Sequence, residues 1–345
     1  MRRPFRSGMA SMMQLRLLCK VVVKANDLAR RKDGTINRWL ADVCERKVPA
    51  NPKPIKGVHT VDVTIDPEAG VWVRLFIPTE ETVETPSKSA SNDTQIESNK
   101  TMPIVYYYHG GGFTILCPDF YLYDVFCRRL AKCCKSVVIS LHYRRAPEFK
   151  FPTAYDDSFK GLEWLQSEKA TASLPLNVDF SRVFLCGDSA GANIAYHMAL
   201  QSARKDLGRV SLKGVVIIQG FFGGEERTPA ELRLKNVPLV SVESLDWYWK
   251  SYLPKGSNRD HPACNIFGPN SSDLSDVSLP PFLNIVGGLD ILQDWEMRFA
   301  EGLQKAGKQV QTIFYEEGIH TFALLNQAKV GPKMFLDVAA FINSH

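Results

Sequence analysis

The sequence predicts an α/β fold in which a mostly parallel sheet carries helices on both faces. From residue 104 onward, short apolar runs alternate with segments of helical periodicity, which is typical of a parallel sheet covered on both sides. A second observation is Gly187-Asp188-Ser189-Ala190-Gly191, which joins an apolar run to a helical pattern and matches the strand–turn–helix of a nucleophile elbow. The 345 residues, 45% of them hydrophobic, suffice for one large domain with a substantial core.

The N-terminal part of the chain precedes the predicted sheet. Residues 1–14 are expected to be disordered, and residues 15–55 hold helical patterns at 14–29 and 36–46, with a turn between them. A minimal core of this kind needs neither helix. We therefore interpret 15–55 as a lid or cap over a binding pocket, a type of element that moves. The alternative is that both helices pack on a face of the sheet.

The core is expected to span residues 56–345 and to begin with a β-hairpin. Residues 58–65 and 71–78 alternate apolar and polar side chains around Asp66-Pro67-Glu68-Ala69-Gly70, which is a hairpin signature. Residues 79–100 are rich in Ser, Thr, Glu, Asn and Lys and are interpreted as a disordered surface insertion, because loop entropy grows slowly with length. The elements expected after it are strand 104–108, helix 121–134, strand 136–143, helix 156–168, strand 182–186, the helix from 192, strand 213–220, helix 241–253, strand 281–288, helix 294–307, strand 311–315 and a helix near 330–343.

The serine at the centre of the elbow is the candidate nucleophile. In such a tight turn, side chains at the flanking positions Gly187 and Gly191 would clash, so glycine is used there. Ser189 then projects at the head of a helix, whose N-terminal amides favour a nearby negative charge. G-x-S-x-G also occurs by chance, so this interpretation depends on the strand before the turn and the helix after it.

A serine nucleophile needs a base, which comes last along the chain in folds with this turn. His320 follows the apolar strand 311–315 on a predicted loop, whereas His345 is the C-terminal residue. His320 is therefore the predicted base, although in isolation it would be read as a surface loop residue.

The acid should lie between the serine and the histidine. Asp290 directly follows the apolar run 281–288, at the carboxyl end of a strand where parallel sheets place their sites. Asp294 competes with it, but precedes a helical pattern and is better interpreted as a helix N-cap. Ser189, Asp290 and His320 are the predicted catalytic triad.

A glycine loop completes the expected site. After the apolar strand 104–108 comes His109-Gly110-Gly111-Gly112-Phe113, the HGGG-type loop that supplies amides to an oxyanion hole. The amides of Gly111, Gly112 and Ala190 are predicted to stabilise the tetrahedral oxyanion. His109 is interpreted as a structural loop residue.

Composition excludes several other classes of function. The net charge of +5 includes no long block of like charges, so nucleic-acid binding has little support. Eight cysteines show no C-x-x-C spacing and are read as reduced thiols in an intracellular protein. Lys20 and Lys24 interrupt the N-terminal apolar patch, which argues against a membrane span or signal peptide. No metal or cofactor is expected, and the expected location is cytoplasmic, with a nuclear location and a transit peptide as alternatives.

These motifs resemble the plant carboxylesterases of the hormone-sensitive-lipase group, which have the α/β-hydrolase fold. The resemblance runs from about Lys20 to the end and is carried by residues 109–113, Tyr143-Arg144-Arg145-Ala146-Pro147-Glu148 and the elbow. It is closest to the branch that contains the gibberellin receptors, through residues 31–38, 46–51, 222–228 and 246–249. In those receptors the N-terminal segment closes over the hormone, which supports the lid interpretation.

Three departures from the receptors bear on activity. The receptors have an aliphatic residue at the position of His320, a serine at that of Gly112 and an arginine at that of Leu245. The resemblance therefore implies a working hydrolase rather than a receptor. It also implies a pocket lined by Phe113, Tyr123, Leu245, Tyr248 and Thr321.

The expected function is that of a serine carboxylesterase acting on a small-molecule ester through an acyl-enzyme. One alternative is a receptor-like binding protein for which hydrolysis is dispensable, and only this alternative implies a protein partner at the lid. The other is a lyase of the dehydratase type, using the same pocket, because esterases, a dehydratase and a receptor share the scaffold. The natural substrate and the oligomeric state are left open, with a monomer favoured.

Overall fold

The computed structural model describes residues 24, 27–43, 45–79, 101–235, 237, 239–325, 327 and 330–345. The predicted disorder of residues 1–14, nearly all of the first helical pattern and nearly all of the insertion at 79–100 lie outside these residues. No helix in the described part of the chain is long and apolar enough to cross a membrane.

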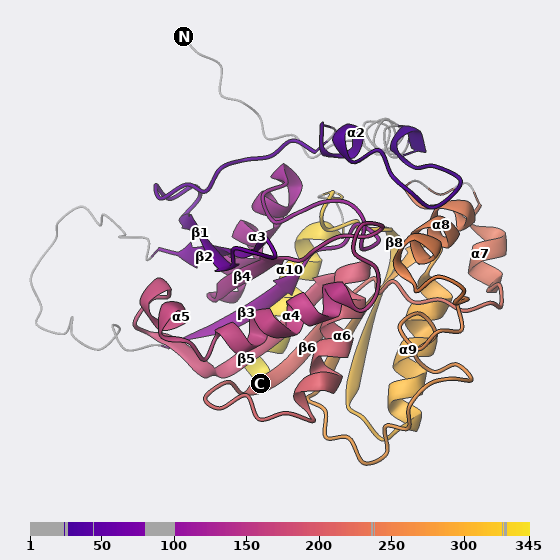
Figure 1. The fold of residues 1–345 in the computed structure, drawn as a ribbon. Coiled ribbons are helices and arrows are strands. Elements are labelled where there is room, and N and C mark those ends of the chain that lie inside the picture. Colours follow the sequence, from indigo (N-terminus) through magenta and orange to yellow (C-terminus); the bar gives the residue numbers. More distant parts are fainter. Residues whose placement is uncertain are drawn as a thin grey trace, which may run out of the picture.

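One eight-stranded sheet forms the centre of the molecule, in the order β1-β2-β4-β3-β5-β6-β7-β8 (Figure 1). β1 pairs antiparallel with β2, and β2 with β4, whereas all the other pairs are parallel. The prediction of a mostly parallel sheet that begins with a hairpin is thus confirmed. The strands are Val58–Asp66 (β1), Val71–Pro78 (β2), Met102–Tyr108 (β3), Val137–His142 (β4), Val178–Asp188 (β5), Leu212–Ile218 (β6), Phe282–Leu289 (β7) and Val310–Ile319 (β8).

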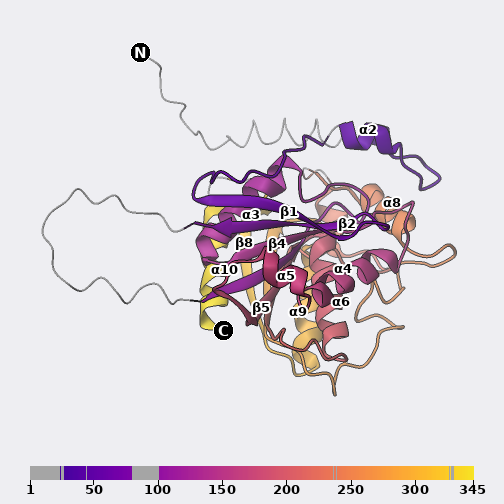
Figure 2. The same ribbon diagram turned by 60° about the vertical axis from the view of Figure 1, so that its left-hand side comes forward.

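Helices cover both faces of the sheet (Figure 2). One apolar cluster packs α4, α6 and α9 against the sheet, and a second packs α3 and α10 on the other side. The strands between them are therefore buried on both faces, which explains their continuous apolar runs. The helices are Arg38–Val43 (α2), Tyr121–Cys134 (α3), Thr153–Trp164 (α4), Glu168–Ser173 (α5), Ala190–Ser202 (α6), Pro229–Arg233 (α7), Val242–Tyr252 (α8), Gln293–Lys305 (α9) and Gly331–Ser344 (α10).

Some elements differ from the sequence-based expectation. The helix expected at 156–168 corresponds to α4, which begins earlier and ends at Trp164. The α5 helix that follows was not predicted, and Ser167 caps it by accepting a hydrogen bond from the amide of Ala170. The short α7 was not predicted. It begins with a capping box in which Thr228 and Glu231 exchange side-chain hydrogen bonds with each other's backbone amides.

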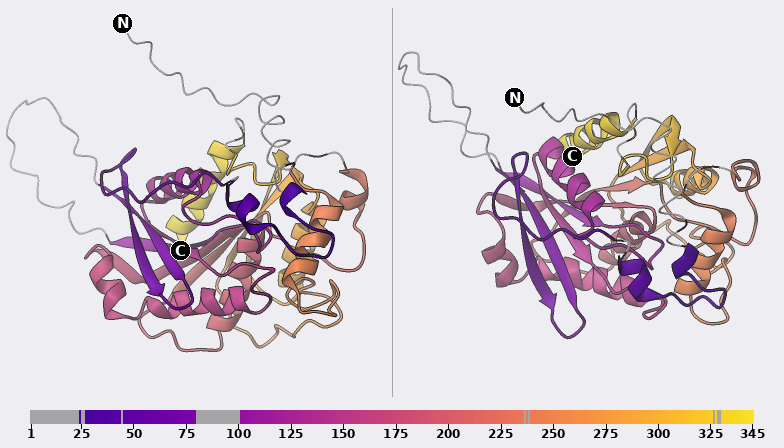
Figure 3. Two further views of the ribbon diagram at one scale, coloured as in Figure 1. Left: turned by 45° about the horizontal axis from the view of Figure 1, so that its top comes forward. Right: turned by 90° about the horizontal axis from the view of Figure 1, so that it is seen from above.

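The N-terminal segment lies across the carboxyl ends of the strands and contacts α8 (Figure 3). Its second helix is shorter than predicted and begins after Asn37, whose side chain accepts a hydrogen bond from the amide of Leu40. The indole of Trp247 donates to the carbonyl of Arg31 at 2.7 Å. Arg38 donates to the carbonyls of Thr114 at 2.5 Å and of Ala146 at 2.7 Å. This segment is therefore in direct contact with the glycine loop that follows β3.

Candidate active site

The G-x-S-x-G turn lies between β5 and α6, as the sequence predicts. A Cβ on Gly187 would be 2.3 Å from the backbone of Gly191, and one on Gly191 would be 1.9 Å from the carbonyl oxygen of Tyr108. No side chain fits at either distance. Ser189 has φ 50° and ψ −118°, a conformation that non-glycine residues rarely adopt and that marks functional turns. The turn thus presents the serine hydroxyl at the head of α6.

Three side chains that are distant in sequence meet at this turn. The hydroxyl of Ser189 lies 3.1 Å from Nε2 of His320, and Nδ1 of His320 lies 2.6 Å from a carboxylate oxygen of Asp290. Asp290 is fully buried, and His320 and Ser189 are 4% and 8% exposed. The predicted residues are therefore arranged as hydroxyl, imidazole and carboxylate within hydrogen-bonding distance.

Asp290 determines the protonation of His320. Burial alone would lower the pKa of His320, but the charge of Asp290, its hydrogen bond and the more distant charge of Asp188 together raise that pKa above its usual value. The carboxylate thus favours the protonated imidazole, which is the form a general base reaches after it accepts a proton.

Asp290 is held in place by groups that sequence reasoning missed. Gln219 donates to the same oxygen of Asp290 as His320 does, at 2.7 Å, and also to the carbonyl of Ile319 at 3.0 Å. The amide of Leu292 donates to the other oxygen at 3.0 Å. Gln219 directly follows the apolar strand β6, so a polar side chain at that strand's carboxyl end was the signal available in the sequence.

The glycine loop is anchored by the aspartate next to the serine. Asp188 is buried and accepts hydrogen bonds from the Tyr107 hydroxyl at 2.6 Å, the Tyr123 hydroxyl at 2.9 Å and the Gly110 amide at 3.0 Å. The Gly110 amide also donates to the Tyr123 hydroxyl at 2.7 Å. Asp188 therefore connects the elbow to the loop.

At two positions the loop has no room for a side chain with its neighbours as they lie in this structure. Gly111 has φ 101°, and a Cβ there would be 2.2 Å from the carbonyl oxygen of Ile115. Gly112 has φ 58°, and a Cβ there would be 2.4 Å from the ring of Tyr248. Among the hydrogen bonds between described residues, none uses the amide of Gly111, Gly112 or Ala190 as donor. These amides are free to bind a ligand oxygen.

The five residues predicted to line a pocket have different surroundings. Phe113 is fully buried and stacks on Tyr252, with ring centroids 3.8 Å apart. Tyr123 is fully buried, and the bonds of its hydroxyl to Asp188 and Gly110 place it beneath the loop as a support. Its assignment to the pocket wall stays a prediction.

The other three predicted residues lie around the loop. Leu245 and Tyr248 are 4% and 9% exposed on α8, and Tyr248 covers Gly112. Thr321, with φ 55°, is half-buried and directly follows His320. Tyr248 thus places α8 against the glycine loop, and the role of these residues in a pocket stays a prediction.

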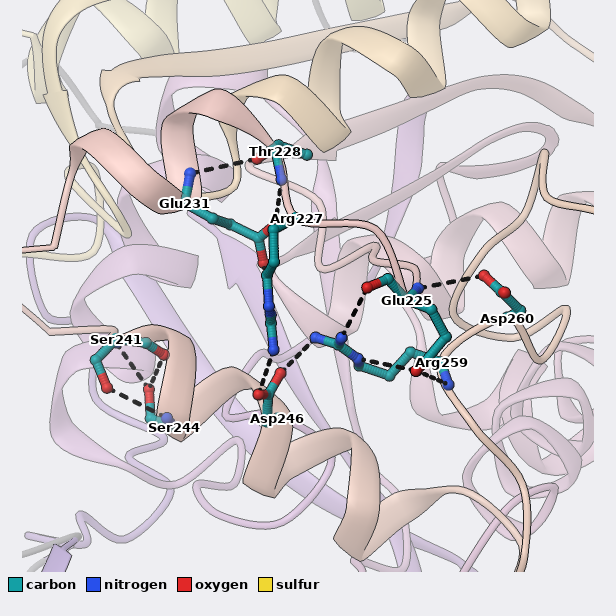
Figure 4. Close-up of polar contacts among 9 residues, drawn as sticks. All are labelled: Glu225, Arg227, Thr228, Glu231, Ser241, Ser244, Asp246, Arg259 and Asp260. Carbon is teal, nitrogen blue, oxygen red and sulfur yellow. Dashed lines mark hydrogen bonds and ion pairs between the residues drawn. The ribbon is translucent and has the colours of Figure 1, made fainter.

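A network of charges fixes α8 relative to the loop after β6 (Figure 4). Asp246 forms ion pairs with Arg227 and with Arg259, the latter at 2.5 Å. Arg227 also pairs with Glu231 at 3.0 Å, and the backbone amide of Arg259 donates to Glu225 at 2.9 Å. Two stretches that carried the family resemblance, 222–228 and 246–249, are joined by these contacts.

The site does not have metal geometry. Asp290, Glu296 and His320 form a group whose possible ligand atoms lie within 4.8 Å of one another. The histidine nitrogen is 2.6 Å from Asp290, which is a hydrogen-bond distance and is shorter than the roughly 3.3 Å between two ligands of a tetrahedral ion with bonds of about 2 Å. Glu296 was not anticipated, because a single acid in an amphipathic helix looks like a surface residue.

Two hollows of the surface lie away from these residues. One of about 1120 Å³ is lined by α9 and the chain near 260–274, including Asp260, Trp295 and Arg298. Another of about 300 Å³ is lined by residues that include Tyr155 and His197. Neither is lined by Ser189, Asp290 or His320.

Comparisons with known proteins agree with this geometry. A family model described as the alpha/beta hydrolase fold matches residues 105–324. Gibberellin receptor GID1C of Arabidopsis thaliana is 39% identical over 320 residues, which cover 93% of this chain and 91% of the receptor. Carboxylesterase 20 of the same plant is 32% identical over 324 residues, which cover 92% and 95% of the two chains.

Solved structures show the same fold. The ester-hydrolase EH1AB1 from the metagenome of Lake Arreo matches with a TM-score of 0.71 and 24% identity, covering 96% of this chain and 98% of that one. An esterase of Pyrobaculum calidifontis matches with a TM-score of 0.68 and 24% identity, covering 96% and 91%.

Proposed function

We propose, from the premise that the chain belongs to the α/β-hydrolase fold family and to its group of plant carboxylesterases and gibberellin receptors, that this protein is a serine carboxylesterase of small-molecule esters. One observation carries the proposal. The Ser189 hydroxyl, the His320 imidazole and the Asp290 carboxylate form a continuous series of contacts of 3.1 Å and 2.6 Å. A binding protein has no need of this arrangement.

The first half of the reaction acylates the serine. Nε2 of His320 takes the proton of Ser189 as its oxygen attacks the ester carbonyl, and Asp290 stabilises the resulting imidazolium. The free amides of Gly111, Gly112 and Ala190 bind the oxyanion, at about 2.7–4 kcal/mol per donor. His320 then returns the proton to the departing alkoxide, and an acyl-enzyme remains.

The second half releases the acid. His320 takes a proton from water, which attacks the acyl carbonyl, and the tetrahedral intermediate collapses to a carboxylic acid and free Ser189. This sequence of steps uses only side chains and amides of the chain.

Short-chain p-nitrophenyl esters provide the direct test. We expect hydrolysis by the wild type, and a loss of roughly 10³-fold or more in kcat for Ser189→Ala and for His320→Ala, with little additional loss in the double variant. Ser181→Ala, an exposed serine at the opposite end of β5, is the matched control and should retain full activity. Equal rates in all variants would refute the assignment.

The fate of solvent oxygen distinguishes hydrolysis from elimination. With an ester substrate in ¹⁸O-water, hydrolysis through an acyl-enzyme places one ¹⁸O in the acid product, whereas a lyase reaction places none. Mass spectrometry should also find the acyl adduct on the peptide that contains Ser189.

Receptor-like binding is the second candidate, favoured by the 39% identity to a gibberellin receptor over 93% of this chain and by the contact of the N-terminal segment with α8. It predicts that a small carboxylic acid binds tightly and stays chemically unchanged. Calorimetric titration of Ser189→Ala with gibberellins tests it, and we expect no binding heat.

A further inference from the structure

Glu296 is a buried acid that the proposed reaction does not use. It lies on α9 and is fully buried. One carboxyl oxygen accepts a hydrogen bond from the amide of Gly287 at 3.3 Å, and the other has no hydrogen-bond donor among the described residues. A buried carboxyl group with an unsatisfied oxygen is costly unless it is neutral or has a partner.

The neighbours of Glu296 are the acid and the base of the proposed triad. One carboxyl oxygen of Glu296, one of Asp290 and a ring nitrogen of His320 all lie within 4.8 Å of one another. α9 packs on β7, and the side chain of Asn284 in that strand donates to the carbonyl of Glu296 at 3.0 Å. The backbone thus holds Glu296 next to Asp290.

No lysine or arginine compensates a second negative charge at this place in the described part of the chain. Asp294 on the same helix adds negative charge, and Arg298 pairs outward with Glu226 at 3.0 Å. The other titratable groups on the elements that pack against α9 are Tyr315, Glu316 and Glu317 of β8 and Glu231 and Arg233 of α7. Glu316, Glu317 and Arg233 are exposed, and Glu231 pairs with Arg227. Burial, followed by the charge of Asp290, raises the pKa of Glu296 well above its usual value.

Asp290 can accept one more hydrogen bond. A carboxylate offers about four acceptor positions. The described donors fill three of them: His320 and Gln219 on one oxygen, and the Leu292 amide on the other. A protonated Glu296 is a donor of the right kind at the right place.

We propose that Glu296 is a positioning residue, which remains a neutral acid and donates a hydrogen bond to Asp290. The donor fixes the orientation of the Asp290 carboxylate toward His320, and the pair carries one negative charge instead of two. The inference rests on the proposed esterase function only for its kinetic readout.

The first substitution distinguishes a neutral Glu296 that donates a hydrogen bond from an ionised Glu296. Glu296→Gln keeps size, neutrality and a donor, so kcat should stay within about threefold of wild type, and the acid limb of kcat/KM, which reports the His320 pKa, should not move. If Glu296 were ionised, the same substitution would remove a negative charge and shift the acid limb to lower pH, which would overturn the proposal.

Glu296→Leu removes the donor without leaving a buried charge, a type of exchange that folds tolerate. We expect kcat to fall by roughly tenfold or more with KM nearly unchanged, because a misoriented Asp290 affects the chemical step. An unchanged kcat would refute the positioning role. Glu301→Gln, an exposed acid on the same helix, is the matched control, and melting temperatures verify folding.

A measurement without turnover keeps this inference separate from the esterase proposal. In the Ser189→Ala background, proton NMR can follow the low-field signal of the Nδ1 proton of His320. Glu296→Gln should leave its shift and its titration close to those of Ser189→Ala alone, whereas Glu296→Leu should displace the signal. No displacement by leucine would contradict the proposal, even if the wild type hydrolysed no ester.

Discussion

Two buried aspartates lie at the carboxyl ends of strands of the same sheet and differ in their hydrogen-bond partners. Asp188, at the end of β5, accepts only from neutral groups, two tyrosine hydroxyls and the Gly110 amide. Asp290, just after β7, accepts from the imidazole of His320. Burial raises the pKa of Asp188 against the hydrogen bonds that lower it. The hydrogen-bond partners, rather than the residue type or the depth of burial, distinguish the aspartate that holds the loop from the one that contacts the proposed base.

The largest expected effect separates the two aspartates by activity. Asp290→Asn should lower kcat by about 10⁴-fold, because the amide favours the wrong tautomer of His320. Thermal stability should change little, since an asparagine fits the same space. Steady-state kinetics with a p-nitrophenyl ester, beside a melting curve, measures both. If Asp290→Asn kept its activity, the proposed difference in catalytic role between Asp290 and Asp188 would be refuted.

Asp188→Ala should show the converse pattern, with stability as the main loss. Three donors lose their buried acceptor, and at about 1–3 kcal/mol for each unsatisfied group the free energy of unfolding should fall by several kcal/mol. Activity of the folded fraction should fall less than in Asp290→Asn. Urea denaturation with an active-site titration tests this. A stability equal to that of wild type would contradict the anchoring role.

The pH profile gives a smaller and more specific contrast. The base must be neutral, so activity should rise with pH through the raised pKa of His320 and fall as pH drops below it. Asp290→Asn removes the main cause of that elevation, and the acid limb should move to lower pH. Asp188→Asn removes only the weaker, more distant charge and should move the limb less. A larger movement for Asp188→Asn would mean that Asp188, and not Asp290, is the main cause of the raised pKa of His320.

The smallest effects come from the tyrosines that serve Asp188. Tyr107→Phe and Tyr123→Phe each remove one hydroxyl, at a cost of about 1 kcal/mol or somewhat more, because the acceptor is charged. Tyr123→Phe should also reduce kcat, since its hydroxyl contacts the Gly110 amide as well. Equal kinetics for the two variants would show that the loop does not depend on Tyr123.

The sequence predicted those features that depend on short stretches of chain. The glycines at 187 and 191 and the serine between them lie within five residues after an apolar strand, so the turn can be recognised from the sequence alone, although a side chain at 191 is excluded by Tyr108 of another strand. Asp290 and His320 could be placed because each follows an apolar strand, and parallel strands bring their carboxyl ends to one edge.

The residues that were missed depend on tertiary contacts. Gln219 and Glu296 act through Asp290, and neither lies in a recognisable motif. Asp294 was expected to cap α9, but it lies in the first turn of that helix and accepts a hydrogen bond from the amide of Ala230 in α7. The contact of the Tyr123 hydroxyl with Asp188, which helps to hold the glycine loop, was also missed.

Arg38 connects the N-terminal segment to two loops at once, through the carbonyls of Thr114 and Ala146. A shift of α2 away from the sheet would break both bonds together. Amide hydrogen exchange in the two loops should therefore accelerate in parallel when Arg38 is replaced by methionine. The exchange rates of these two loops would then measure how firmly the N-terminal segment is held against the rest of the molecule.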